Sequence, residues 1–238
     1  MAKGVRRMIT VETIRERHSV REYDGKPLSR AEFDALGAVV EEYARESGLD
    51  VQLVGDNPEV FNVIARFGLI RGCRTHVAFV VDDGKARGVA ADEAIGYWGQ
   101  KIVLAAQDMG LNTCWCALCS RKKSRAVVAP EKKIRLVIAV GHGKTQGFSR
   151  KTKSVEALSS VECAKAPAWF AAAMKAAQLA PTAMNNQNFK ITLFSDGKTV
   201  RIDAPQSGLN VIDEGIVRCN FEIAANEAGA DWRWEREI

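Results

Sequence analysis

Residues 95–119 read IGYWGQKIVLAAQDMGLNTCWCALC, and this stretch decides the fold. Apolar residues recur at helical spacing in its first part, so the sequence predicts a helix that ends at Gly110. Small residues such as Gly96 and Gly99 occupy the other faces and leave almost no hydrated side. A helix that is apolar nearly all round is buried, and small residues let another backbone approach it closely. Residues 112–116 then read as a short strand.

The same pattern returns in residues 214–234, EGIVRCNFEIAANEAGADWRW. With a shift of 119 positions, five residues coincide with Gly96, Ala105, Ala106, Gly110 and Trp115, namely Gly215, Ala224, Ala225, Gly229 and Trp234. An ungapped match at half the chain length indicates an internal duplication, although two Ala-rich helices can also resemble each other by chance. We therefore expect two helix-plus-strand halves whose central helices pack together in one core.

The composition is that of an ordinary soluble globular protein of 238 residues. The net charge of +5 is mild, and basic residues cluster only near 121–125 and 144–153, which favours a local anionic ligand over a nucleic-acid-binding face. The apolar runs are too short to span a bilayer, and no segment resembles a signal peptide. We expect a cytoplasmic protein without nucleic-acid or membrane partners.

Six cysteines without secretory features favour reduced thiols over a disulfide framework. Cys114, Cys116 and Cys119 form a CxCxxC segment, and Cys73 and His76 could complete a metal site with them. Two observations argue against a metal: Cys114 and Cys116 share one face of the predicted strand, and the recurrent CxxC spacing of zinc knuckles is missing. Free cysteine is commonly a small buried hydrophobe, so we expect no metal.

The remaining sequence predicts helices and strands in one interlocked α+β domain, residues 1–238, with halves of roughly 1–160 and 161–238. A capping box, Ser29 with Glu32, opens one helix. Further helices are predicted over residues 10–17, 57–67, 120–128, 167–180 and 210–229. Strands are predicted over residues 51–54, 77–81, 134–140, 190–194 and 199–203, with turns at 82–84 and 196–197.

Two groups of basic residues are candidates for binding a phosphate. The first places two guanidinium groups and a hydroxyl within one turn: Arg17, His18, Ser19 and Arg21. Alone, such a turn is more often solvated surface. The second follows a buried strand and could close over the same anion: Lys144, Arg150, Lys151 and Lys153. The glycines of this loop are spaced GxGxxxG, one residue too long for a dinucleotide fingerprint.

The loop of residues 180–187 carries neutral amides, Asn185, Asn186 and Gln187, that donate and accept hydrogen bonds at once. Such groups suit the edge of a heterocycle, whereas the simpler interpretation is a loop that caps itself. The sequence shows no Ser-His-Asp triad and no paired carboxylates with a clear role. If the protein is an enzyme, a cofactor therefore carries the chemistry.

Four motifs in a consistent order together resemble the FMN-dependent nitroreductase family. They are RHSVREY at 17–23, GLNTCW at 110–115, APEKKIRLVIAVGHG at 129–143 and APTAMNNQNF at 180–189. The resemblance spans most of the chain and is closest to the subgroup whose single chain contains both halves of the usual dimer. It implies a nitroreductase-like α+β fold, with a central mixed or antiparallel sheet flanked by helices, duplicated into a pseudo-dimer that acts as a monomer.

The resemblance also implies FMN as the cofactor, and it assigns three groups of residues to it. The phosphate and ribityl chain would be held by Arg17, His18, Ser19, Arg21, Arg150, Lys151 and Lys153. The backbone beside the reactive nitrogen N5 would come from Trp115, Cys116, Ala117 and Leu118. The loop over the ring would come from Pro181, Thr182, Ala183, Asn185 and Gln187.

The order of the motifs carries further information. Ordinary members of the family have the Pro-Ser/Thr loop early in the chain, where this sequence reads ARESGLD. Here that loop lies in the second half, where no RHSVR equivalent occurs. Each half keeps what the other lacks, which predicts one flavin site at the pseudo-twofold interface and a second site that has decayed. The sequence departs from the family pattern at Ala117, Leu118 and the Asn188-Phe189 pair. These departures bear on the identity of the substrate more than on the identity of the cofactor.

By resemblance, the function would be an FMN-dependent oxidoreductase with a ping-pong scheme. NAD(P)H would reduce the flavin at N5, and a nitro, quinone or other small organic acceptor would reoxidise it; the residues themselves need only orient the ring and limit water. Three alternatives remain open at this stage: a non-catalytic flavin-binding or sensor protein, a cysteine-based metal or thiol-redox protein, and an interaction domain without a cofactor.

Overall fold

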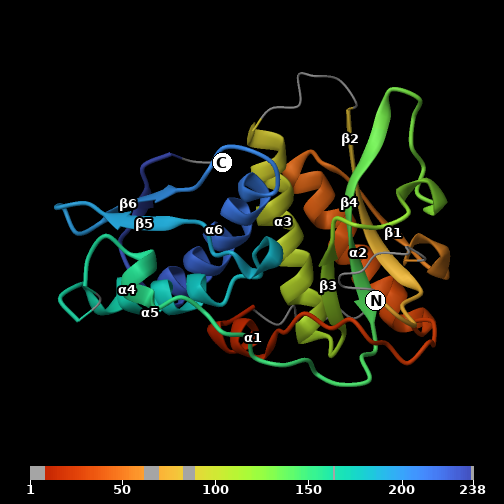
Figure 1. Cartoon of the computed structure of the whole chain (residues 1–238), viewed down its shortest axis with the longest axis horizontal. Helices are drawn as coiled ribbons and strands as arrows, with labels where there is room; N and C mark the ends of the chain where they lie inside the picture. The colour runs from red at the N-terminus through yellow and green to blue at the C-terminus, as the bar shows by residue number, and fades with distance from the viewer. Residues whose placement is uncertain (1–8, 62–69, 83–88, 163, 237–238) are drawn as a thin grey trace, which may run out of the picture.

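Two long helices lie side by side at the centre of the molecule, and a sheet lies on either side of them (Figure 1). The computed structural model describes residues 9–61, 70–82, 89–162 and 164–236. The central helices are α3 (Val89–Asp108) and α6 (Asn210–Glu227). The prediction that they pack against each other is confirmed, although α3 begins earlier than residue 95.

The two helix backbones touch where they cross. A Cβ atom added to Gly96 would lie 2.0 Å from the Ile212 carbonyl oxygen, and one added to Gly215 would lie 2.0 Å from the Glu93 carbonyl oxygen. Real Cβ atoms do not come that close, so only glycine permits this crossing. The small residues of the quoted stretch therefore serve a close helix–helix contact.

The first sheet has the order β1-β2-β4-β3, with every neighbouring pair antiparallel. Its strands are β1 (Asp50–Val54), β2 (Thr75–Asp82), β3 (Asn112–Cys116) and β4 (Lys132–Gly141). One face packs on α3 and on α2 (Arg30–Ser47), while the other face carries a second apolar cluster with Tyr23 and Phe61. Both faces are therefore buried, as the continuous apolar runs of β2 and β4 indicate.

The second sheet has the order β5-β6-β7 and lies on the far side of α6. Its strands are β5 (Lys190–Leu193), β6 (Thr199–Asp203) and β7 (Arg233–Trp234), with β5 antiparallel and β7 parallel to β6. Helix α5 (Ala168–Gln178) packs on α6. In the described part of the chain the expected single central sheet is thus wrong. The apolar helices α3 and α6 need cover on all sides, so they take the centre and the sheets lie outside.

Several shorter predictions can be compared with the structure. Helix α1 (Val11–Glu16) follows Thr10 as its cap, and Ser29 and Glu32 form the expected capping box before α2. The helix predicted over 57–67 begins as the 3₁₀ turn η1 (Pro58–Phe61), and its remainder lies outside the described residues, as does most of the 82–84 turn. A short helix, α4 (Val155–Leu158), was not predicted.

The predicted basic helix over residues 120–128 is wrong, because only η2 (Arg121–Lys123) is helical there. Side chains that are distant in sequence but adjacent in space accept hydrogen bonds from the backbone N–H groups of this segment. Asn57 Oδ1 accepts from the Arg125 N–H at 2.9 Å, and Gln52 Oε1 accepts from the Val127 N–H at 2.8 Å. Because these N–H groups already donate to side chains outside the segment, they are not available for the backbone hydrogen bonds of a helix.

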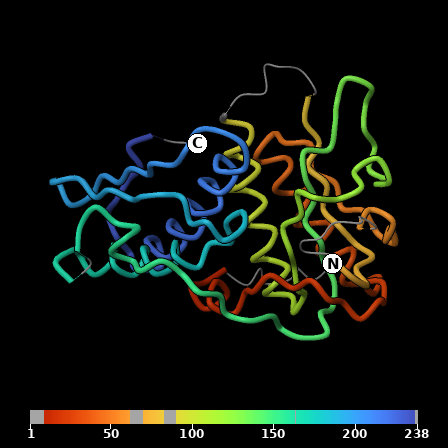
Figure 2. The backbone as a smooth tube through the Cα atoms, viewed as in Figure 1, coloured from red at the N-terminus to blue at the C-terminus, as the bar shows by residue number. Residues whose placement is uncertain are grey.

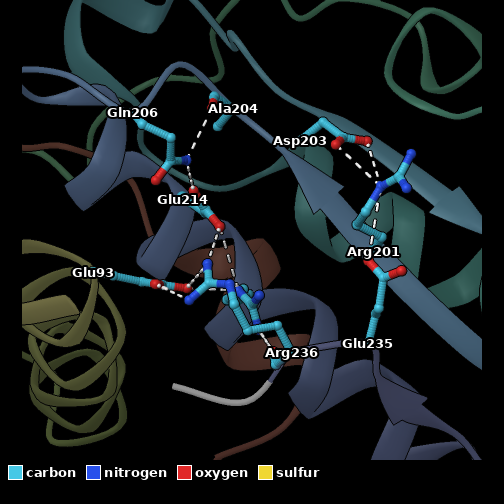
Figure 3. Close-up of polar contacts among 9 residues, drawn as sticks. Glu93, Arg201, Asp203, Ala204, Gln206, Glu214, Glu235 and Arg236 are labelled. Atoms are coloured by element: carbon cyan, nitrogen blue, oxygen red, sulfur yellow. Dashed lines mark hydrogen bonds and ion pairs between the residues drawn. The ribbon is translucent and has the colours of Figure 1, made fainter. Parts of the chain in front are cut away.

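Buried charges join α3, α6 and the C-terminal segment (Figure 3). Arg218 Nε lies 2.9 Å from a Glu93 carboxylate oxygen, and both side chains are almost fully buried. Arg236 closes the cluster from outside, 2.9 Å from Glu93 and 3.1 Å from Glu214. The Arg218 guanidinium also lies 4.5 Å from the centroid of the Trp234 ring. Removing one member would leave a buried charge unpaired, which typically costs about 3–5 kcal/mol.

Candidate functional site

The first basic segment runs alongside the beginning of β3. Ser19 bridges Thr113, and the Val20 N–H donates to the Thr113 carbonyl at 3.0 Å. Arg17 is only 5% exposed, so the simpler interpretation of this turn as solvated surface is wrong for this residue. Its Nη2 donates to the Leu179 carbonyl at 3.3 Å, while its buried Nε has no partner within the described residues.

Burial, and after it the nearby charge of Arg150, lower the pKa of Arg17 to about 10. The pKa of Arg150 is itself lowered by burial and by Arg21. The pKa of the half-buried His18 is lowered by burial, then by Arg17 and Arg150. These cations therefore lie close together and repel one another. Such a cluster is stabilised when an anion binds between them.

The second basic segment crosses from β4 to the second half beside the N-terminal segment (Figure 2). A Cβ atom added to Gly147, whose φ is +83°, would lie 2.6 Å from the His18 Cβ, so this loop touches the first basic segment directly. Beyond it, Arg150 and Lys151 are exposed. The prediction that two basic segments from different parts of the chain face one anion site is consistent with this placement.

Gln187 joins the second basic segment to the amide loop. It is 2% exposed, and its Oε1 accepts from the Lys153 N–H at 2.6 Å, while its carbonyl accepts from Lys153 Nζ at 3.0 Å. Its Nε2 donates to the Gln178 carbonyl at 2.9 Å, and its N–H donates to Thr182 Oγ1 at 3.0 Å. Because the Lys153 ammonium is bonded to Gln187, this lysine contributes to holding the loops together.

Other residues of the amide loop are held in unusual backbone conformations. Met184, Asn185 and Gln187 have positive φ values of 53°, 57° and 45°. The Asn185 side chain donates to the Lys151 carbonyl at 2.7 Å, which gives a second link to the basic segment. Strained backbone of this kind persists only where its surroundings enforce it and is frequent at ligand sites.

Asp213, in the first turn of α6, fixes the beginning of the loop. Both of its carboxylate oxygens accept from the Ala183 N–H, at 2.9 and 3.0 Å. Burial raises the pKa of Asp213 to about 7, even though the bond from Ala183 lowers it. Sequence reasoning missed Asp213, and an acidic residue directly after the apolar Val211 and Ile212 in the first turn of the helix is the signal that could have found it. It also missed the carbonyls of Gln178 and Leu179, which no side-chain pattern reveals.

The 115–118 segment leaves the edge strand β3 next to the cations. Trp115 packs against Gly99, where an added Cβ would lie 2.4 Å from its ring, and stacks on Phe79 at 6.1 Å. Cys116 is buried, Ala117 is half-buried and Leu118 is 69% exposed. Burial raises the pKa of Cys114, while Arg21, Arg17 and Arg150 lower it, so β3 lies close to all three arginines.

The structure therefore brings the four motifs of the sequence together, from both halves of the chain. Arg17 contacts the backbone that leads into Pro181 and Thr182, both buried, and Lys151 and Lys153 bond the amides of the same loop. Among the described residues, His, Cys, Asp and Glu form no group of three or more that could hold a metal. No helix within those residues is long and apolar enough to cross a membrane.

The chain resembles known proteins along most of its length. The sequence model of the family described as "Putative TM nitroreductase" matches residues 9–225. One similar solved structure is a "putative nitroreductase" of Thermotoga maritima, with a TM-score of 0.64, 19% identity and coverage of 100% of this chain and 95% of that chain. Another is a "putative nitroreductase in complex with FMN" of Desulfovibrio desulfuricans, with a TM-score of 0.50, 19% identity and coverage of 64% and 95%. No curated protein matches the chain.

Proposed function

The chain belongs to the nitroreductase family, and from that premise we propose that it is an FMN-dependent oxidoreductase with one flavin site between its two halves. The observation that carries the proposal is the cluster of mutually repelling cations around the buried Arg17, which is hydrogen-bonded to the backbone leading into the amide loop of the other half. A phosphate would neutralise the cluster, and the partnerless Nε of Arg17 offers it a buried donor.

The residues present fit FMN in type and placement. Arg17, His18, Ser19 and Arg21, with Arg150 and Lys151, would hold the phosphate and ribityl chain, while Lys153 would hold the loop. The backbone of residues 115–118 and the loop residues Pro181, Thr182, Ala183, Asn185 and Gln187 would border the ring. The Desulfovibrio relative described as an FMN complex supports this choice of cofactor. When bound, the flavin supplies hydride transfer, and the protein orients the ring and excludes water.

The contacts between α3 and α6 support the interpretation of the chain as a duplicated pseudo-dimer. Gly96 contacts Ile212, and Gly215 contacts Glu93. The 119-position shift relates Gly96 to Gly215 and Glu93 to Ile212, so the two contacts are equivalent. Reciprocal contacts of this kind are characteristic of a twofold interface.

The strand order supports the same interpretation. In the first half β1 and β2 are antiparallel, and β3 runs parallel to β2 with β4 between them. In the second half β5 and β6 are antiparallel, and β7 runs parallel to β6 with no strand between them. The second sheet thus matches the first without β4. The loop that carries Arg150 and Lys151 follows β4, so the second half has no source for that part of a phosphate site.

The buried charges of Figure 3 give a reason for a single flavin site. A shift of 119 positions relates Gly99 to Arg218 and Trp115 to Trp234. Trp115 packs on bare backbone at Gly99, whereas the Arg218 side chain extends over the Trp234 ring and pairs with Glu93. The place related to the packing of Trp115 on Gly99, beside the candidate site, is therefore occupied by ion-paired side chains. We propose one FMN per chain and a protein that functions as a monomer.

The electron donor and acceptor follow from the family rather than from particular residues. We propose NAD(P)H as donor and a nitro or quinone compound as acceptor, in a ping-pong scheme. The test is the visible spectrum of the purified protein, the release of FMN on denaturation, and steady-state NAD(P)H oxidation with a quinone or nitroaromatic. Bound FMN without turnover would instead identify a non-catalytic flavin-binding protein, and a colourless preparation that does not take up added FMN would refute the proposal.

A further inference from the structure

Two cysteines meet at the turn that follows β3. Cys116 ends the strand and is buried, while Cys119 lies in the turn and is half-buried. The thiol of Cys116 hydrogen-bonds the sulfur of Cys119. Two other described cysteines, Cys73 and Cys114, donate to backbone carbonyls, as Cys116 also can to Leu118. The pair at 116 and 119 is thus already in contact, in a CxxC arrangement.

Four hydrogen bonds hold the turn around the two sulfurs. Arg121 Nη2 donates to the Ala117 carbonyl at 2.8 Å, and the Arg121 N–H donates to the Cys119 carbonyl at 2.9 Å. The Ser120 N–H donates to the Val60 carbonyl at 2.8 Å, and the Cys116 thiol lies 3.3 Å from the Leu118 carbonyl. A disulfide needs its two Cβ atoms close together, and the hydrogen bond between the two side chains brings their sulfurs into contact across this turn.

The two thiols differ in chemical character. The hydrogen bond from Cys116 and the charge of Arg121 lower the pKa of Cys119, although burial opposes them. The same hydrogen bond, together with burial, raises the pKa of Cys116 far above its usual value. Cys119 is thus the more accessible sulfur and the one whose pKa is lowered, whereas Cys116 is buried and holds its proton more strongly. This is the arrangement of an attacking and a resolving cysteine.

We propose that Cys116 and Cys119 form a reversible dithiol–disulfide pair, in which Cys119 attacks an incoming low-molecular-weight disulfide and Cys116 resolves the product. The Cys119 thiolate bonds to one sulfur of the incoming disulfide and expels the other as a thiolate, which takes up a proton. Cys116 then loses its proton and attacks the Cys119 sulfur, expelling the second thiolate. The protein loses two electrons and two protons, and the small disulfide is reduced to two thiols.

The new bond would close over Ala117 and Leu118. The proposed function places these residues at the flavin ring, so the oxidised turn would hold that backbone in one conformation. Formation of the disulfide does not depend on a flavin, and its test is therefore separate from the test of the proposed function. The effect on the flavin is an additional measurement in the holoprotein.

The test uses oxidised glutathione as the small disulfide and the full-length protein, with counting of thiols and intact mass as readouts. Every variant also carries Cys163→Ser, because Cys163 lies outside the described residues. The parent should fall from five thiols to three without retaining glutathione, and dithiothreitol should restore all five. Cys116→Ser should instead retain one glutathione on Cys119. Cys119→Ser should keep its remaining thiols free.

Cys114→Ser is the matched control, since Cys114 lies on the same strand and is also buried. It should form the disulfide like the parent. Cys116→Ala repeats the trapping experiment if circular dichroism shows that the serine variant misfolds. The proposal is overturned if the parent keeps five free thiols, if Cys116→Ser traps no glutathione, or if Cys119→Ser is modified at Cys116 as fast as the parent reacts.

Discussion

Replacing Gly96 by alanine tests the crossing of α3 and α6 on which the whole architecture depends. The added methyl group would lie 2.0 Å from the Ile212 carbonyl oxygen and 2.9 Å from its carbonyl carbon. Ordinary contact begins near 3.4 Å, so the helices would have to separate by roughly 1.4 Å at this point. The atoms in the way belong to backbone, which cannot turn aside as a flexible side chain can.

Overfilling a packed core costs about 1–3 kcal/mol, and occasionally more. The clash at Gly96 is with backbone, so we expect the upper part of that range. Alanine in place of a mid-helix glycine returns about 0.5–1 kcal/mol. The net loss in the free energy of unfolding should therefore be about 2 kcal/mol. Gly37→Ala in α2 is the matched control, because its methyl group would lie an ordinary 3.8 Å from Leu53, and it should stabilise the protein slightly.

The assay is urea unfolding followed by circular dichroism, with the midpoint and the slope compared among the variants. Gly215→Ala should cost about as much as Gly96→Ala, because the contacts are reciprocal. The double variant should cost less than the sum, since one separation of the helices accommodates both methyl groups. A Gly96→Ala protein as stable as Gly37→Ala would refute the close crossing, and fully additive losses would refute the shared contact.

Three further predictions concern the candidate site. Arg21→Ala should weaken FMN binding about 10- to 100-fold, since a charge-assisted hydrogen bond contributes about 1.5–3 kcal/mol. Arg17→Ala should weaken FMN binding further and also lower the stability of the protein, because Arg17 is buried. Unchanged affinity for FMN in a fluorescence titration would contradict the phosphate assignment. Asp213→Asn should abolish a pH dependence of stability. The pKa of Asp213 is about 7 in the folded protein against an ordinary 3.8, so the wild type loses stability as pH rises from about 4 to about 7. The variant should therefore unfold at a higher urea concentration than the wild type at pH 8 but not at pH 4, and parallel pH profiles of the two proteins would contradict this. Gln187→Ala should lower stability by about 1–3 kcal/mol, because two partly buried hydrogen bonds to backbone groups are lost. The exposed Asn186→Ala should change it by less than about 0.5 kcal/mol, and equal effects would argue against a role of Gln187 in holding the loops together.

The central helices and most strands could be predicted from the sequence, because their apolar patterns are long and end at clear signals. Gly110 and the capping box of Ser29 and Glu32 lie where the sequence places them. The failed helix over 120–128 shows the limit of local reasoning. Its donors are bonded by Asn57 and Gln52, which are far away in the sequence.

The candidate site was predictable in its residue types but not in its connections. The motifs identified Arg17 and Gln187, whereas their partners are the backbone carbonyls of Leu179 and Gln178 and the N–H of Lys153. Backbone groups have no signature in a sequence, since every residue except proline carries the same donor and acceptor. The two-sheet arrangement was missed for a related reason: periodicity reports which face is apolar, but not what covers it.

The number of FMN molecules released per chain tests the central claim most directly. The protein, purified and saturated with FMN, is freed of excess ligand and denatured, and the released flavin is measured against the protein concentration. One FMN per chain is expected, because the proposed site needs both the cations around Arg17 and the loop around Gln187, and the ion-paired Arg218 occupies the place that the 119-position shift relates to Gly99. A ratio of two, or no bound flavin at all, would contradict the account.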